Sequence, residues 1–233
     1  MITIRTLATG STGNCYHISD SKTSLLLECG IKFKTIQQAL NFQTSNVAGV
    51  LVSHEHKDHC KAVQDVADRG LDIYMSQGTA DAIGIQHHRI RPANCKEAFK
   101  IGTWTVLPFD VQHDAAEPLG FLIANQDGDK LLFATDTYYI KYKFSGLTHL
   151  MIECNYSQKI LENNVENGRI PEFLKNRVMQ SHFSLENLLV FLNSNDLSRV
   201  QEIHLLHLSD SNSNEIEFKH AVQVATGKLV YVA

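Results

Sequence analysis

The sequence has no run of about 18 consecutive apolar residues, the length that a membrane-spanning helix requires. Its first residues also lack the charged region followed by an apolar stretch that marks a secretory signal. We therefore expect neither membrane attachment nor export. No internal repeat or low-complexity linker interrupts the chain. Its 233 residues, 43% of them hydrophobic, favour a single globular domain over residues 1–233 rather than two small ones.

The pattern of cysteines does not favour a disulfide framework. The five cysteines are odd in number, widely separated and never spaced as Cys-x-x-Cys. This pattern fits buried free thiols in a reducing compartment, and we expect a cytoplasmic protein. Cys60 adjoins a cluster of histidines, and we interpret it as a small packing residue rather than as a metal ligand.

The chain also lacks the basic excess typical of proteins that bind nucleic acid through charge. It has 21 Lys and Arg against 25 Asp and Glu, a formal net charge of −4, which weakly disfavours a nucleic-acid partner. Two bound divalent cations would add about four positive charges locally, so this balance does not exclude one. Six basic residues are candidates for phosphate contacts, although most are better interpreted as solvated surface charges: Lys57, Lys61, Arg89, Arg91, Lys141 and Lys143.

Apolar runs of strand length alternate with segments of helical periodicity. The predicted strands are Ile2–Leu7, Cys15–Ile18, Ser24–Glu28, Val47–Ser53, Leu71–Met75, Trp104–Val111, Leu119–Asn125, Lys130–Ala134, His149–Glu153, Gln201–His207 and Leu229–Val232. The predicted helices are Ile31–Asn41, Cys60–Arg69, Gln77–Gly84, Gln158–Val165, Pro171–Met179, Leu185–Asn193 and Asn214–Ala225. Asn163–Arg169 is the most polar stretch, and we expect a mobile loop there. This alternation suggests two sheets sandwiched between helices.

A dense set of metal-binding side chains occupies residues 54–59, His54-Glu55-His56-Lys57-Asp58-His59. It directly follows an apolar run, and a strand ending in such a loop can present His54 and His56 to one metal. Asp58 and His59 can then face a second metal about 3.5–4 Å from the first, the separation typical of two-metal hydrolases. Imidazole with carboxylate suits zinc, and also manganese or iron. Histidine-rich runs also occur as incidental metal traps, but this one is internal, spaced and preceded by a strand pattern.

Further ligands are expected at the ends of later strands, because one cluster of four cannot close two metal sites. His113, Asp136 and His207 each follow an apolar run, where a sheet fixes the position of a side chain that the following loop exposes. Asp136 is the natural bridge between two metals, since Asp58 already belongs to the first cluster. Each of these residues alone is weak evidence, and their occurrence with the cluster is what favours a metal site.

Taken in order, these motifs resemble those of the metallo-β-lactamase superfamily. The resemblance implies an α/β fold, a four-layer αββα sandwich of two mixed β-sheets flanked by helices. It implies that one metal ion is bound by His54, His56 and His113. It implies that the other is bound by Asp58, His59 and His207, with Asp136 as the bridge.

Within the superfamily the chain is most similar to the small YycJ/WalJ-type exonucleases, which lack the added domain of the β-CASP nucleases. The matching stretches span nearly the whole chain: Thr9 to Asn14, Ser53 to His59, His113 to Pro118, Thr135 to Thr137, Glu153 to Asn155, Ser181 to Ser184, and His207 to Ser209. One position departs from the pattern. Related chains usually carry Asp where this chain has Glu28, and that carboxylate partners the ligand histidines. Glu28 reaches one methylene further, which puts this contact in doubt.

The resemblance also suggests catalytic roles and substrate contacts. Asp58 would orient and deprotonate a water molecule, and His182 would protonate the leaving group, as a histidine in a similar setting does in transfer-RNA 3′-processing nucleases. Alternatively, His182 has no catalytic role and simply precedes a helix whose N-terminus Ser184 caps. The loop holding Ser11 and Asn14 has small residues that let backbone amides approach an anion, although a plain tight turn is an equally good interpretation. Asn155 ends a strand near the same rim and is a further candidate for substrate contact.

The leading hypothesis is a phosphodiesterase, a hydrolase that uses two divalent metal ions (zinc, manganese or iron). A 5′→3′ exonuclease acting on nucleic acid, with DNA favoured, fits the resemblance. The alternative within the same fold is hydrolysis of a small phosphoester, thioester or lactam. The surroundings of His113 lack the Thr-Pro-Gly-His pattern of thioesterase-like members, which counts against that alternative. A non-catalytic relative that kept the fold should have lost ligands, and none is missing here.

Overall fold

The computed structural model describes residues 1–233, and the chain divides into two compact units. The first unit comprises Met1–Asp110 and Ala115–Asp129, and the second comprises Val111–Asp114 and Lys130–Ala233. No helix of either unit has the length and apolar character needed to span a lipid bilayer.

The first unit contains a six-stranded mixed sheet in the order β1-β2-β3-β4-β5-β6. Strands β1 to β3 pair antiparallel, and β3 to β6 pair parallel. The bounds are β1 Thr3–Ala8, β2 Cys15–Ser19, β3 Ser24–Leu27, β4 Val47–Leu51, β5 Ile73–Met75 and β6 Ile90–Pro92. A parallel strand with neighbours on both sides is buried on both faces, which explains the continuous apolar run of β4.

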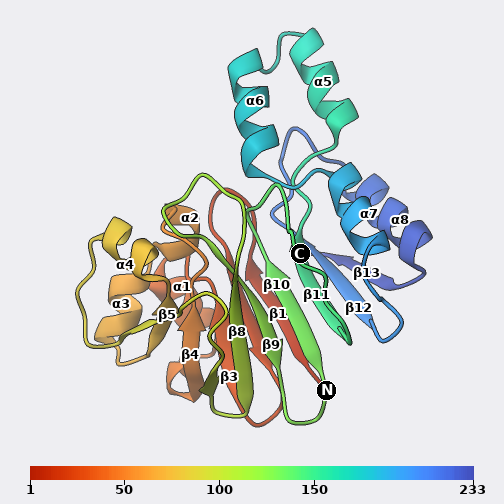
Figure 1. Cartoon of the computed structure of the whole chain (residues 1–233). Helices are drawn as coiled ribbons and strands as arrows, with labels where there is room; N and C mark the ends of the chain where they lie inside the picture. Colours follow the sequence, from red (N-terminus) through yellow and green to blue (C-terminus); the bar gives the residue numbers. More distant parts are fainter. The chain divides into compact units, whose positions relative to one another are not determined.

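Short helices cover this sheet, and three further strands complete the first unit. The helices are α1 Phe33–Ala39, η1 Thr44–Asn46, α2 Lys57–Cys60, α3 Val63–Asp68 and α4 Gln77–Ile83. Figure 1 shows α3 and α4 together beside β5. Apolar side chains from α1, α3, β4 and β5 form one buried cluster. The remaining strands are β7 Phe99–Ile101, β8 Trp104–Asp110 and β9 Leu119–Ala124, which pair antiparallel in that order.

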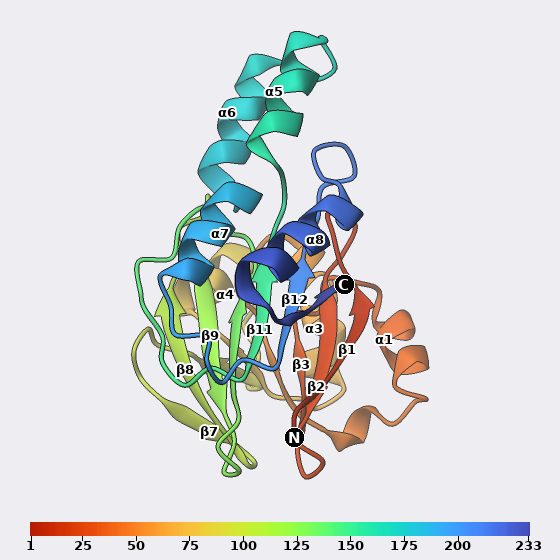
Figure 2. The same cartoon turned by 90° about the vertical axis from the view of Figure 1, so that its right-hand side faces the viewer.

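The second unit is built on four parallel strands, β10 Lys130–Ala134, β11 His149–Glu153, β12 Glu202–Leu206 and β13 Leu229–Val232. Its helices are α5 Gln158–Glu166, α6 Glu172–Ser181, α7 Leu185–Asn193 and α8 Glu215–Thr226. Figures 1 and 2 show α7 and α8 side by side next to β11 and β12, and α5 and α6 as a two-helix arm that extends away from these strands. Together with β7 to β9, these four strands make up the second, seven-stranded sheet.

The α/β class with two mixed sheets flanked by helices is confirmed, and four details of the prediction are wrong. The helix predicted at Cys60–Arg69 is two helices, α2 and α3. The chain breaks between them because the amide of Ala62 donates to the carbonyl of Cys29, 2.9 Å away, instead of to its own helix. The strands β6 and β7, of three residues each, were not predicted. The helix predicted at Ile31–Asn41 is also shorter, at Phe33–Ala39.

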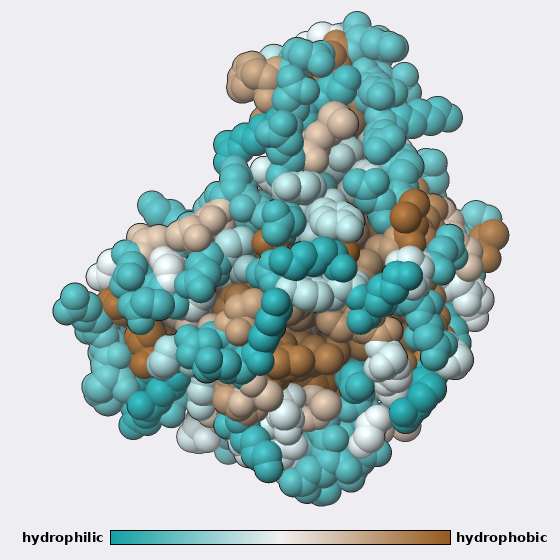
Figure 3. All heavy atoms as spheres, in the orientation of Figure 1, coloured by the Kyte–Doolittle hydropathy of each residue, from teal (hydrophilic) through white to brown (hydrophobic).

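The polar stretch Asn163–Arg169, the best candidate for a mobile loop, is divided in the structure between the end of a helix and the turn that follows it. Helix α5 continues to Glu166. The side chain of Asn164 is buried and donates to the carbonyl of Ser211 and to Oδ1 of Asn212, both at 2.9 Å. Polarity alone was misleading because this helix belongs to a two-helix arm, whose surface is largely hydrophilic in Figure 3.

The loop that carries the histidine cluster is bound to two other segments by backbone hydrogen bonds. The amide of Asn14 donates to the carbonyl of Asp58 (2.7 Å), and the amide of Cys29 donates to the carbonyl of His59 (2.9 Å). Gly30 lies against the same loop so closely that an added Cβ would overlap the carbonyl oxygen of Asp58. Hydrogen bonds formed far apart in the sequence therefore position Asp58 and His59.

We expect Gly30→Ala to destabilise the protein by at least about 3 kcal/mol. The added methyl group would overlap backbone atoms of Asp58, which cannot move aside as a flexible side chain could. Urea unfolding followed by circular dichroism measures the change. Gly168→Ala is the matched control. Its site is open but has a φ of +67°, so its cost is expected to be only about 1–2 kcal/mol. Equal losses in the two variants would contradict the packing account.

Candidate metal centre

The first unit brings the four residues of the histidine cluster together beyond the end of β4. The His54 ring lies 4.7 Å from the His56 ring and 4.2 Å from the His59 ring, centroid to centroid. Asp58 lies in α2, with Oδ2 at 3.3 Å from Nε2 of His59. His54 and His59 are buried, while His56 and Asp58 are half-buried. The predicted cluster is therefore a cluster in space as well as in sequence.

Buried polar side chains surround His59 and the strand end. Nδ2 of Asn14 lies 3.2 Å from Nε2 of His59 and also donates to the carbonyl of Asp58 at 3.3 Å. The carboxylate of Glu28 accepts from the amide of Ser53 at 3.2 Å, and its Oε2 lies 3.7 Å from Nδ1 of His59. Asn14 thus supports the cluster from inside the protein, and the longer Glu28 side chain still reaches the vicinity of the ring.

The second unit assembles its own set at the carboxyl end of three neighbouring parallel strands. Asp136 follows β10, Glu153 ends β11 and His207 follows β12. Because β10, β11 and β12 are hydrogen-bonded in parallel, these ends meet at one edge of the sheet. Potential ligand atoms of Asp136, Glu153, His182 and His207 all lie within 4.8 Å of one another. Asp136 and His207, both predicted from strand ends, therefore lie close together in the structure.

His113 joins Asp136 within the same unit. Nδ1 of His113 donates to the carbonyl oxygen of Ser181 at 2.8 Å, since a carbonyl can only accept. This fixes the tautomer and leaves Nε2, which lies 3.7 Å from Oδ2 of Asp136. A backbone partner on the other ring nitrogen is the usual arrangement for a histidine that binds a metal.

Glu153 is the functional residue that sequence reasoning missed. Its side chain is fully buried and accepts from Nδ1 of His182 at 2.6 Å, from Nδ1 of His207 at 3.1 Å, and from the amides of Thr137 at 3.0 Å and Phe183 at 2.9 Å. One carboxylate therefore orients two imidazoles and two chain segments. Its place at the end of an apolar strand is the same signal that pointed to Asp136 and His207, and that signal could have identified it.

Two histidines of this unit have pKa values displaced in opposite directions. Burial lowers the pKa of His113, which keeps the ring neutral and able to bind a metal. Burial also acts to lower the pKa of His182, but the Glu153 carboxylate outweighs it, and the pKa of His182 is raised. A protonated His182 suits a proton donor, so the two environments separate the two roles.

Backbone strain occurs at one residue of each set. Glu28 has a φ of +63° and His207 a φ of +54°, values that residues other than glycine rarely adopt. Strained backbone of this kind costs about 1–3 kcal/mol and persists where surrounding contacts hold it. Here the amide of Glu28 donates to the carbonyl of Leu51 at 2.8 Å, and Nδ2 of Asn155 donates to the carbonyl of His207 at 2.8 Å.

The structure separates the remaining candidates. Asn155 is buried and bonded to His207, so it supports a candidate ligand from within rather than lining a rim. Ser11 is exposed in the Gly10–Asn14 turn.

Cys60 is buried, its Sγ donates to the carbonyl of Glu55 at 3.0 Å, and burial raises the pKa of its thiol to about 11. The interpretation of Cys60 as a packing residue is supported. All five cysteines are free, and Cys95 is the one that is not buried.

Comparison with known proteins identifies the family. The model of the beta-lactamase superfamily domain matches residues 23–204, and the chain belongs to this family. The chain is 29% identical over 241 residues to the exodeoxyribonuclease YycJ of Bacillus anthracis, covering 95% of this chain and 88% of that one. It is 28% identical over 235 residues to the exodeoxyribonuclease WalJ of Streptococcus pneumoniae, covering 94% and 85%. The predicted resemblance is confirmed.

The fold is likewise that of the family. The crystal structure of the metallo-beta-lactamase fold protein YhfI from Bacillus subtilis superposes with a TM-score of 0.77 at 13% identity, covering 100% of this chain and 97% of that one. The donor set of the two units consists of imidazoles and carboxylates, with no thiol among them, which fits divalent zinc, manganese or iron. Family membership and these clusters support a metal-dependent hydrolase.

We expect Glu153→Gln to lower the pKa of His182 in the metal-free protein, because burial then acts without the opposing carboxylate. Titration of the ring proton by NMR measures it, with the exposed His220 as internal control. In the parent protein the folded pKa of His182 lies above the unfolded value of about 6.5. Its contribution to stability is therefore complete below that value and is lost as the pH rises through the folded pKa. An unchanged His182 titration in the variant would refute the assignment.

Proposed function

We propose that the chain is a dinuclear metal-dependent phosphodiesterase that removes nucleotides from DNA, most simply from the 5′ end. The observation that carries the proposal is the hydrogen bond between His182 and Glu153, within a group of candidate ligands that includes Asp136 and His207. Both relatives that match nearly the whole chain are exodeoxyribonucleases, which supports DNA as the substrate.

We assign the metal ligands as the family resemblance implies. His54, His56 and His113 would hold one divalent cation, Asp58, His59 and His207 the other, and Asp136 both. When bound, two such cations supply a nucleophile made from water near neutral pH and neutralise charge on the phosphate.

The chain's own residues then account for the movement of protons. Asp58 accepts a proton from the attacking water. Glu153 raises the pKa of His182, which favours the protonated ring, and His182 donates its proton to the oxygen of the departing nucleotide. With Nδ1 of His182 bound to Glu153, the proton leaves from Nε2. Glu153 itself does not touch substrate in this account and acts as a positioning residue.

The need for a proton donor favours a phosphodiester over a thioester. A thiolate leaves without protonation, whereas the alkoxide released from a nucleic-acid strand is a strong base and requires an acid. A raised pKa of His182 therefore has no evident use in thioester hydrolysis. This argument moves a thioester behind the phosphodiester, while the exodeoxyribonuclease relatives favour nucleic acid over a small phosphoester or a lactam.

We expect His182→Ala to lower the rate of nucleotide release from labelled DNA by about 10²- to 10⁴-fold with manganese or zinc present. The same variant should retain most activity toward bis(p-nitrophenyl) phosphate, whose leaving group is stable as an anion. Labels at the 5′ and 3′ ends report the direction of release. His220→Ala, on an exposed face of α8, is the matched control and should leave both rates unchanged.

Asp58→Ala should abolish both reactions, because it removes a proposed ligand together with the base. Metal content per chain, measured by mass spectrometry on the same samples, separates loss of metal from loss of chemistry. Failure of the parent protein to release nucleotides from any DNA would overturn the nuclease proposal. Equal losses on both substrates in His182→Ala would overturn the role of His182 as the acid.

A further inference from the structure

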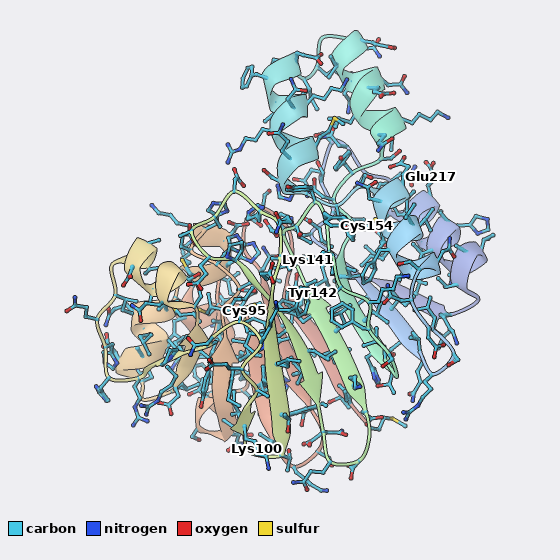
Figure 4. The ribbon with its side chains drawn as sticks, viewed as in Figure 1. Cys95, Lys100, Lys141, Tyr142, Cys154 and Glu217 are labelled. Atoms are coloured by element: carbon cyan, nitrogen blue, oxygen red, sulfur yellow. The ribbon has the colours of Figure 1, made fainter.

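A segment that alternates aromatic and basic residues begins two positions after Asp136. It reads Tyr138-Tyr139-Ile140-Lys141-Tyr142-Lys143, and we call it the aromatic–basic segment. Ile140 is buried and anchors it, while the side chains of Tyr138 and Tyr139 are 37% and 56% exposed. Lys141 and Lys143 are also exposed, and Nζ of Lys141 lies 5.2 Å from the centre of the Tyr142 ring (Figure 4).

Two cavities of the second unit meet at this segment. One, of about 460 Å³, lies between the aromatic–basic segment and α7. The other, of about 610 Å³, is lined by His113, by α6 residues including Phe173 and Arg177, and by Tyr138. Tyr138 lines both cavities, of which one reaches the candidate ligand His113 and the other reaches the exposed lysines, and we call these two adjoining cavities the strand path.

The charge and apolar character of this path fit a nucleic-acid strand. The lining of the first cavity contains two lysines and no carboxylate. In the second, Nε of Arg177 lies 3.4 Å from Oδ2 of Asp114, the acidic residue of that lining. Phe173 is 75% exposed and lines the same cavity, so it adds an aromatic face to it.

We propose that the aromatic–basic segment binds an unpaired nucleic-acid strand next to the scissile phosphate, with bases stacked on Tyr138 and Tyr139 and phosphates held by Lys141 and Lys143. Aromatic faces stack on any base, and lysines contact phosphates without regard to sequence. A base inside a duplex has both faces covered by its neighbours, so this segment requires a separated strand. The inference rests on the proposed nuclease function and adds the strand form that the enzyme accepts.

The test is equilibrium binding of a short fluorescent DNA strand, measured by anisotropy in the presence of EDTA, so that no hydrolysis occurs. Tyr138→Ala with Tyr139→Ala should weaken single-strand binding at least about 5-fold. Tyr138→Phe with Tyr139→Phe should bind like the parent, because phenylalanine retains the stacking face. Tyr231→Ala, which removes another half-exposed tyrosine (44%), is the control and should have no effect.

The lysines are tested through the dependence of binding on salt. Lys141→Gln with Lys143→Gln should reduce the slope of log affinity against log salt by about 1.4, the value for two phosphate contacts with a single strand. Lys219→Gln, on α8, should leave the slope unchanged. A hairpin duplex of the same composition should bind more weakly than the single strand and should be insensitive to the tyrosine substitutions.

These outcomes distinguish the inference from the function on which it rests. Hydrolysis of bis(p-nitrophenyl) phosphate by the parent protein reports on the proposed metal centre by itself, because that substrate is too small to need the strand path. Unchanged single-strand affinity in the tyrosine double variant, or equal loss for strand and duplex, would overturn the inference while leaving nuclease activity in place. If the parent protein binds the single strand but releases no nucleotides from DNA, the proposed function would be overturned instead.

Discussion

The buried carboxylate of Glu153 is the constraint on which the rest of the second unit's site depends. A carboxylate enclosed by protein is stable only where donors surround it, and here two imidazoles and two backbone amides do so. Those four donors belong to the strand end after Asp136, the turn between α6 and α7, and the residue after β12. Hydrogen bonds to this one acidic group therefore join segments that lie far apart in the sequence, and its carboxylate raises the pKa of His182.

The first unit also has a buried carboxylate beside its candidate ligands, that of Glu28. Glu28 is fully buried at the end of β3, accepts the amide of Ser53 and approaches the ring of His59. In each unit a carboxylate without solvent contact therefore stands behind the candidate ligands and binds the backbone of the neighbouring strand end. Outer carboxylates of this kind hold ligand rings in one orientation and raise their basicity. Strained backbone at Glu28 and His207 is consistent with geometry that function, rather than local preference, selects.

Local patterns pointed to side chains that the structure brings together, because the candidate ligands are concentrated in a few short segments of the sequence. The cluster from His54 to His59 is contiguous, and Asp136 and His207 follow apolar strands whose ends had to be exposed. What could not be predicted depends on partners distant in sequence. The role of Glu153 depends on His182, 29 positions away, and the break between α2 and α3 depends on a hydrogen bond from Ala62 to Cys29. The polar residues 163–169 look like a loop because a solvated two-helix arm needs few apolar residues.

The central proposal is that the chain binds two metal ions through the ligands assigned above. The most direct measurement is an anomalous difference map from crystals of the parent protein loaded with manganese. The account predicts two peaks, one beside His54, His56 and His113, the other beside Asp58, His59 and His207, with Asp136 in contact with both. A single peak held by Glu153 and His182, or no peak at these residues, would contradict it.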